Sequence, residues 1–145
     1  MQALDTKSTV STLNKIMQYE LAGVVRYTHS ALMVRGPFRA PIVQFMQSQA
    51  EESLVHAQKA GEILTGLGGH PDQGIAPIEE THQHTIIDLL REALLHEQAA
   101  LSLYKELLKI VENASVYLEE YARGMIGQEE LHTMELYKML RDYES

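Results

Sequence analysis

Four glutamates and two histidines of this chain occupy positions where apolar side chains are expected. In each of four segments, apolar residues at helical spacing form a stripe, and one acid interrupts that stripe near its middle. The four acids are Glu20, Glu52, Glu97 and Glu129, and two of the segments add His56 and His132. His132 follows Glu129 by three residues and His56 follows Glu52 by four, so each pair lies on one helical face. The pattern predicts six polar side chains inside a helical core.

Such a cluster is the chemistry of a metal site. An ionised carboxylate in an apolar interior is costly unless it is paired, protonated or bound to a metal. Four converging carboxylates repel one another, and cations remove that repulsion. Oxygen ligands with imidazole suit iron or manganese, and the ligand set does not separate the two. In di-iron carboxylate bundles, two helices each give one Glu, and two others each give Glu-x-x-His, as in Glu129-Glu130-Leu131-His132.

The segment around His56 departs from this spacing. The residue three positions before His56 is Ser53, and Glu52 lies four before it. Glu51 is turned about 140° away from His56 around a helix, so we expect it to be exposed. Glu52 is therefore the favoured acid of this segment, and a site that lacks one carboxylate is the alternative.

Prolines and glycines divide the chain into four long helices. Proline breaks a helix interior, and the four prolines lie at residues 37, 41, 71 and 77. We predict helices over about 8–35, 38–67, 82–112 and 115–142, with Ser8, Thr9 or Ser11 as the first N-cap. No segment alternates with the period of two that marks a strand. Helices of this length are typical of bundles.

The connections between these helices are unequal. A few residues join the first helix to the second and the third to the fourth, which makes each pair antiparallel. The segment GGHPDQGIAPIEET separates the pairs, and when extended it is long enough to cross the whole bundle. The fold class predicted is all-α, a four-helix bundle of two antiparallel pairs joined by a long crossover, in one domain over residues 1–145. That topology is the one of ferritin-like folds.

Composition excludes several classes of function. The chain has 145 residues and a net charge of −8, which argues against a nucleic-acid surface. Its apolar runs are shorter than the roughly 20 residues of a membrane span, and the N-terminus shows no signal peptide, so we expect a cytoplasmic protein without membrane contact. The chain contains 0 cysteines, which excludes disulfides, iron–sulfur clusters and thiolate-bound zinc.

Four segments carry a resemblance to the bacterioferritins of the ferritin-like superfamily. They are LNKIMQYELAGVVRYTHSALM, HAQKAGEILTGLGGHP, REALLHEQAALSLYKELL and GQEELHTMELYKML. The resemblance extends over nearly the whole chain. The resemblance implies that Glu129 and Glu52 bridge two irons. It further implies that Glu20 with His56, and Glu97 with His132, each complete one iron. Tyr27, seven residues after Glu20, then contacts a ligand or donates an electron, or is a core tyrosine that needs only a hydrogen-bond partner.

The activity implied by the resemblance is that of a ferroxidase in iron homeostasis or storage. Two Fe(II) ions per chain are oxidised to Fe(III) by dioxygen or hydrogen peroxide. Haem is not expected, because Leu54 stands where bacterioferritins place the haem methionine, two residues before His56. Only thirteen residues follow His132, too few for the fifth helix of cage-forming members, so a homodimer is as much expected as a larger homo-oligomer.

Two alternative functions and one further segment stay open. The bundle resembles rubrerythrin-like di-iron oxidases and peroxidases as well, or it is a structural or interaction bundle with an inert or vestigial metal site. The segment Glu79-Glu80-Thr81-His82-Gln83-His84 in the crossover could form a secondary metal site, although solvated loop residues are the simpler interpretation. His29, His70 and His96 show no ligand spacing with an acid on the buried face.

Overall fold

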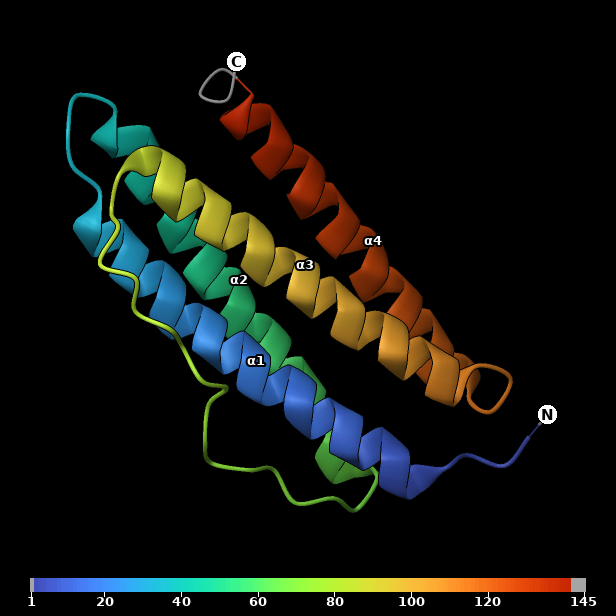
Figure 1. Ribbon diagram of the computed structural model, residues 1–145. Helices are drawn as coiled ribbons and strands as arrows, with labels where there is room; N and C mark the ends of the chain where they lie inside the picture. The colour runs from blue at the N-terminus through green and yellow to red at the C-terminus, as the bar shows by residue number, and fades with distance from the viewer. Residues whose placement is uncertain (1, 142–145) are drawn as a thin grey trace.

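The computed structural model describes residues 2–141 as four helices (Figure 1). They are α1 (Thr6–Met33), α2 (Arg39–Gly66), α3 (Ile86–Val111) and α4 (Val116–Leu140). Short turns join α1 to α2 and α3 to α4, so each pair is antiparallel, and residues 67–85 return along α1 so that α2 and α3 run in the same direction. The described residues contain no strand. The predicted all-α fold with one long crossover is confirmed.

Capping residues place the helix starts, and two of them differ from the prediction. The Asp5 side chain accepts a hydrogen bond of 3.0 Å from the backbone N–H of Ser8, so α1 begins at Thr6 and none of the three predicted residues is its cap. Thr85 accepts from the N–H of Asp88 at 3.1 Å, so α3 begins at Ile86 and not near residue 82. His82 has a left-handed φ of 56°, which a helix excludes.

The other helix ends lie close to the predicted ones. The first helix ends at Met33, two residues before the predicted end, and the second spans Arg39–Gly66. Pro41 lies in the first turn of α2, where a missing N–H costs no helical hydrogen bond. Gly68, with a φ of 83°, turns the chain out of α2. Position 142, the predicted end of the last helix, lies outside the described residues.

The crossover loop is hydrogen-bonded to α1 along its length. The Asn14 side chain donates to the carbonyl of His70 at 3.1 Å and accepts from the N–H of Asp72 at 2.9 Å. Farther along, the N–H of Ala76 donates to the carbonyl of Gln18 at 3.0 Å. These bonds hold the crossover loop against α1, and Figure 1 shows the loop running beside that helix.

The apolar core consists of two clusters separated along the helix axes. One contains Leu13, Ile16, Leu64, Leu107 and Leu118 with their neighbours. The other contains Tyr27, Met46, Leu90, Leu136 and Leu140 with theirs. The buried polar residues Glu20, His56, Glu97 and Glu129 occupy the helix positions between these two clusters. The sequence thus folds into a bundle with a polar layer at mid-length.

Candidate metal centre

The polar layer contains two groups of side chains that share one carboxylate. Glu20, His56 and Glu129 form the first group, and Glu97, Glu129 and His132 form the second. Within each group the candidate ligand atoms lie within 4.8 Å of one another. All four helices contribute, because α1 carries Glu20, α2 carries His56, α3 carries Glu97 and α4 carries the remaining two.

In the first group, the imidazole of His56 faces two acids. Its Nδ1 lies 2.9 Å from Oε2 of Glu20 and 4.0 Å from Oε1 of Glu129. The Tyr104 hydroxyl donates a hydrogen bond of 2.8 Å to the same Oε2 of Glu20. Burial raises the pKa of Glu20, although the contact with His56 opposes that shift. Nδ1 of His56 therefore points into the polar layer.

The second group repeats this arrangement. Nδ1 of His132 lies 3.6 Å from Oε2 of Glu97 and 3.7 Å from Oε2 of Glu129. The hydroxyl of Tyr27 donates a hydrogen bond of 2.5 Å to Oε1 of Glu97. Tyr27 is thus in contact with a site carboxylate. The two groups match, with one tyrosine, one histidine and one terminal acid on each side of Glu129.

Glu52 lies outside both groups and faces the outer nitrogens of the histidines. Its Oε1 lies 3.2 Å from Nε2 of His132 and 3.7 Å from Nε2 of His56. Its side chain is 35% exposed, whereas that of Glu129 is 1% exposed. Ser53 is buried and Glu51 is exposed, as expected for Glu51 from its position around the helix.

Two residues that the sequence analysis did not assign to the site lie beside it. Oε1 of Gln128 accepts a hydrogen bond of 3.1 Å from Nε2 of His56. His96 is buried, and its ring stacks on Tyr19 with centroids 4.4 Å apart and meets the edge of Tyr27 at 5.6 Å. Gln128 and His96 each directly precede a predicted ligand in the sequence, and neither lies on the apolar stripe that marks the ligands.

Burial and mutual contact shift the pKa values of the layer in opposite directions. Burial raises the pKa of Glu129 to about 9 despite the contact with His132. Burial also acts to raise the pKa of Glu97, but the contacts with His132, Glu129 and Tyr27 lower it to about 2. Burial acts to lower the pKa of His132, yet its three carboxylate neighbours raise it to about 12. In the absence of metal, protons therefore stay on Glu129 and His132 at neutral pH.

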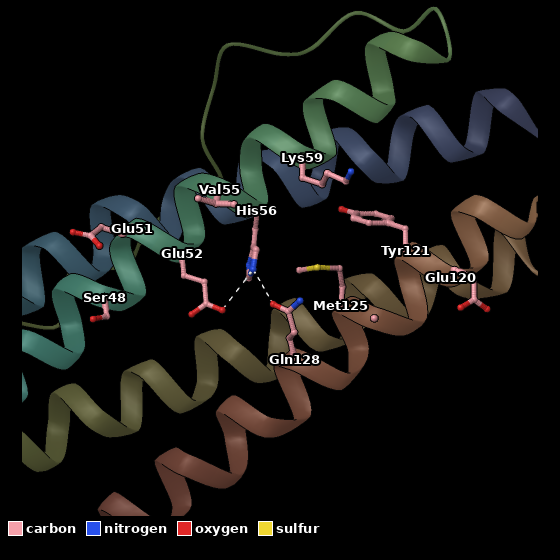
Figure 2. Close-up of a pocket in the computed structure, with 11 residues that line it drawn as sticks. Ser48, Glu51, Glu52, Val55, His56, Lys59, Glu120, Tyr121, Met125 and Gln128 are labelled. Carbon is pink, nitrogen blue, oxygen red and sulfur yellow. Dashed lines mark hydrogen bonds and ion pairs between the residues drawn. The ribbon is translucent and has the colours of Figure 1, made fainter.

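An opening between α2 and α4 leads to this layer. The cavity has a volume of about 680 Å³, and Glu52, His56 and Gln128 are among the residues that line it. Figure 2 shows these three side chains pointing toward one another from the two helices. Among residues 2–141, no helix combines the length and apolar character that a bilayer span requires.

Comparison with known proteins places these features in a family. The family model described as ferritin-like domain matches residues 10–145. A ferritin-like, diiron-carboxylate protein from Bacillus anthracis str. Ames superposes with a TM-score of 0.89 at 24% identity, covering 96% of this chain and 99% of that one. No curated protein sequence matches the chain.

Two further solved structures show the same fold. A dodecameric thioferritin, the bacterioferritin-related protein of Bacteroides fragilis, has a TM-score of 0.89 at 24% identity and covers 97% of this chain and 89% of its own. Rhodobacter capsulatus bacterioferritin, solved with a metal-free dinuclear site, has a TM-score of 0.83 at 23% identity, with 99% and 89% covered.

Proposed function

This chain belongs to the ferritin-like domain family, and on that premise we propose that it binds two Fe(II) ions in the polar layer and oxidises them to Fe(III). The observation that carries the proposal is the position of Glu129. Its carboxylate is common to both ligand groups, and its side chain is 1% exposed. A buried acid between two matched His–Glu pairs has the placement that a bridging ligand of a dinuclear centre needs.

The donor atoms fit iron. Oε2 of Glu129 and Nδ1 of His132 are buried without a hydrogen-bond partner among the described residues, although each faces the other group members. Buried polar atoms are normally satisfied, so unpaired atoms that converge on one point indicate an ion-binding position. Carboxylate oxygen with imidazole nitrogen is a ligand set that iron accepts.

Each residue has a distinct part in the proposed centre. Glu20 with His56 holds one ion, Glu97 with His132 holds the other, and Glu129 bridges the two. Both histidines present Nδ1 to the ions, and their Nε2 atoms face Glu52. This contact on the far side of each ring fixes the orientation of the imidazole. For Glu52 to act as the second bridging acid, its partly exposed side chain must rotate inward.

The tyrosines position the terminal acids. Tyr104 donates to one oxygen of Glu20 and Tyr27 to one oxygen of Glu97, which leaves the other oxygen of each carboxylate for an ion. Burial raises the pKa of Tyr27 well above its ordinary range, so its hydroxyl keeps the proton that it donates. Tyr27 is thereby a positioning residue of the second group.

The reaction needs an oxidant and a route. Two Fe(II) ions give up one electron each, and one molecule of dioxygen takes both electrons with two protons to form hydrogen peroxide. Hydrogen peroxide as oxidant takes the same two electrons and two protons to form two water molecules. The cavity between α2 and α4 gives these reactants access to His56, and its lining acids Glu51, Glu52 and Glu120 attract cations.

Stopped-flow oxidation of Fe(II) by air tests the proposal. Metal-free protein is loaded anaerobically with two Fe(II) per chain, and Fe(III) formation is followed by absorbance after exposure to air. The wild type is expected to bind about two ions and to oxidise them quickly, and Glu129→Gln to slow oxidation by at least about tenfold, since even outer-ligand changes cost that much. The matched control is Glu130→Gln, an exposed acid next along α4.

Two results would contradict this function. One is binding of no iron by the wild type, and the other is equal oxidation rates for Glu129→Gln and Glu130→Gln. Loading with excess Fe(II) then separates storage from oxidation alone, because a mineral-storing assembly holds tens of ions per chain in solution.

We further propose that the chain forms a homo-oligomer. Large apolar side chains are exposed on all four helices, among them Leu32, Val55, Leu95 and Val116, each at least 60% exposed. Exposed apolar surface of this kind favours contact between copies, and the related thioferritin is dodecameric. Sedimentation velocity is expected to give a mass of at least a dimer of the 16.4 kDa chain, and a monomer at micromolar concentration would contradict this proposal.

A further inference from the structure

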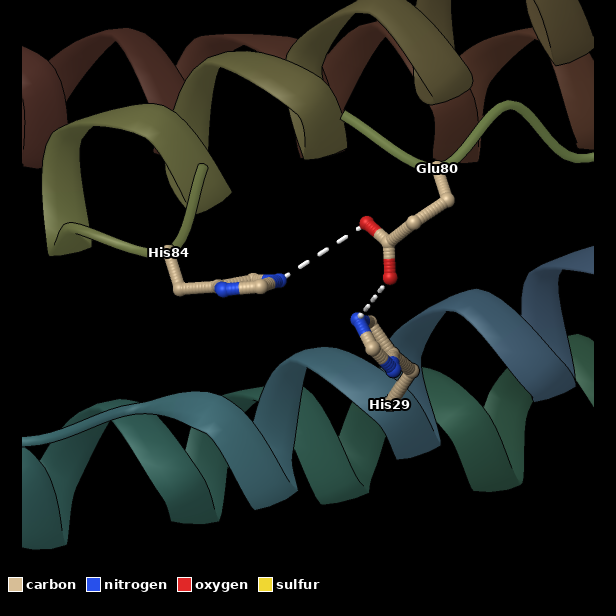
Figure 3. Close-up of side chains that lie close together, drawn as sticks. All are labelled: His29, Glu80 and His84. Atoms are coloured by element: carbon tan, nitrogen blue, oxygen red, sulfur yellow. Dashed lines mark ion pairs between the residues drawn. The ribbon is translucent and has the colours of Figure 1, made fainter. Parts of the chain in front are cut away.

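A third group of ligand-type side chains lies where the crossover loop meets α1 and the start of α3. Nε2 of His29 lies 3.2 Å from Oε1 of Glu80, and Nε2 of His84 lies 3.7 Å from Oε2 of the same carboxylate. The two imidazole rings meet at an angle of 62° with their centroids 5.4 Å apart. Figure 3 shows both rings directed at the carboxylate from α1 and from the end of the loop.

The spacing suits one small cation. The three candidate ligand atoms lie within 4.8 Å of one another. A tetrahedral ion with bonds of about 2.0–2.2 Å holds its ligands about 3.3–3.6 Å apart. The two nitrogen–oxygen separations are therefore close to those of a metal site before any side chain moves.

His84 provides an independent indication. Its Nε2 is buried and has no hydrogen-bond partner among the described residues, although the atom faces Glu80. A buried ring nitrogen without a partner is unfavourable in a loop that could expose it to water. A bound cation would satisfy this nitrogen together with both carboxylate oxygens.

The backbone holds the two loop ligands in place. The N–H of His82 donates to Oε2 of Glu80 at 3.0 Å, which orients the carboxylate. His84 directly precedes Thr85, the residue that caps α3. An adjoining cavity of about 180 Å³ is lined by Glu79 and Glu92 as well as by His29 and Arg26, so acids outnumber the single cationic side chain there.

This group is separate from the polar layer. His29 follows Glu20 by nine residues on α1, which is two and a half helical turns and about 13 Å along the axis. An odd half turn places the two side chains on opposite faces of the helix. Glu20 is buried inside the bundle, whereas His29 lies on its outer surface with 44% of its side chain exposed.

We propose that His29, Glu80 and His84 bind one divalent transition-metal ion of the Zn²⁺ type, which fastens the crossover loop to α1. Two imidazoles and one carboxylate with a fourth position open to water form a ligand set that Zn²⁺ accepts. The ion joins two segments that are far apart in the sequence, α1 with His29 and the end of the crossover loop with Glu80 and His84. Its effect is to hold the end of the loop and the start of α3 against α1.

Zinc binding to the full chain tests this proposal with Zn²⁺ alone as the probe. Equilibrium dialysis of metal-free protein is expected to show one zinc per chain fewer for His29→Gln/His84→Gln than for the wild type. The matched control is His70→Gln, an exposed histidine of the same loop, which keeps the wild-type number. Zinc is also expected to slow amide hydrogen exchange of residues 78–84 in the wild type and in the control, but not in the double variant.

Equal zinc numbers for the wild type and the double variant, or an equal loss in His70→Gln, would overturn the proposal. If circular dichroism shows that the double variant is unfolded, the single variant His29→Gln replaces it, with zinc affinity at this position expected to fall at least about tenfold. Air oxidation of Fe(II) separates the two proposals, because the double variant keeps the wild-type rate, and Glu129→Gln keeps the loop zinc.

Discussion

The buried acids that we propose as metal ligands destabilise the metal-free fold. Glu20, Glu97 and Glu129 are each at most 4% exposed, and charged carboxylates at such positions are destabilising without a counter-ion. In the metal-free chain, the raised pKa of Glu129 keeps this acid protonated, and tyrosine hydroxyls donate hydrogen bonds to the other two acids. Both effects reduce the cost of burial. A residue that keeps the hydrogen bonding and removes the charge should therefore stabilise the metal-free fold.

Glu129→Gln is the substitution in which this destabilisation can be measured. Burial raises the pKa of folded Glu129 from 4.5 to about 9, so the folded chain binds this proton more tightly than the unfolded chain. The contribution of Glu129 to the free energy of unfolding therefore falls as pH rises from about 4.5 to 9. Urea unfolding of metal-free protein at pH 8 is expected to show Glu129→Gln as more stable than the wild type.

The pH dependence provides the control for that experiment. Well below pH 4.5, folded and unfolded wild-type chains both carry the proton, so the advantage of the variant should shrink toward zero. Glu130→Gln is expected to match the wild type at both pH values, because Glu130 is exposed. A variant less stable than the wild type at pH 8 would show that burying Glu129, with the proton it must take up on folding, does not destabilise the fold.

Most of the candidate site was accessible from the sequence because its residues interrupt apolar stripes. Glu20, Glu97 and Glu129 are all buried, as such positions require. Gln128 was not considered and His96 was set aside, because the sequence gives no signal for a polar residue beside the stripe that turns toward a neighbouring helix. The sequence already shows that the acid in α2, Glu52, lies four residues before His56 and not three. Only the side-chain geometry shows that Glu52 faces Nε2 of both histidines.

At the scale of helices, one close approach sets how α1, α2 and α3 meet beside the site. A Cβ atom at Gly23 would lie 2.8 Å from Nε2 of His96 and 2.9 Å from Oγ of Ser53. Both of those side chains are buried. The glycine therefore permits the packing of three helices, and Ser53, which replaces the expected acid, fits the space that Gly23 leaves.

Gly23→Ala is expected to lower the free energy of unfolding. Alanine favours a helix over glycine by about 1 kcal/mol, but overpacking of a core costs about 1–3 kcal/mol, so a net loss of up to about 2 kcal/mol follows. The matched control is Gly127→Ala in α4, where a Cβ would meet nothing within 4 Å and stability should rise by up to about 1 kcal/mol. Thermal unfolding of both variants measures the difference, and a stabilised Gly23→Ala would contradict the close approach.

The four helices and most of their ends were predictable from the sequence, and the start of α3 was not. Periodicity and the Pro–Gly breaks locate all four helices, because helix propensity and packing agree there. The start of α3 near residue 82 was wrong, because His82 adopts a left-handed φ of 56° and Thr85 caps the helix three residues later. The sequence did not predict the left-handed φ or the cap, because several residues of this segment could take either role.

At the scale of the whole molecule, the polar layer divides the apolar core into two clusters. Each cluster packs by itself, and the layer between them contributes repulsion where a continuous core would contribute burial. Bound metal removes that repulsion and adds bonds from all four helices. The metal-loaded and metal-free proteins should therefore differ strongly in stability.

Anaerobic Fe(II) at about one hundred times its dissociation constant is expected to raise the free energy of unfolding by about 2.7 kcal/mol. For a chain of this size that corresponds to a melting temperature roughly 5–10 °C higher. Differential scanning calorimetry with and without Fe(II) measures it, and a chelator should reverse the shift. Glu129→Gln serves as the comparison, and an equal shift in that variant would place the stabilising ion elsewhere.

The crossover loop gives the molecule a further property. It is the covalent link between two helical hairpins, and the polar layer lies at their junction. The first hairpin carries Glu20, Glu52 and His56, and the second carries Glu97, Glu129 and His132. Neither hairpin alone holds both halves of the centre. A proteolytic nick between residues 70 and 78 would thus leave two fragments, each an incomplete chelator, whose reassociation is coupled to the ions they share.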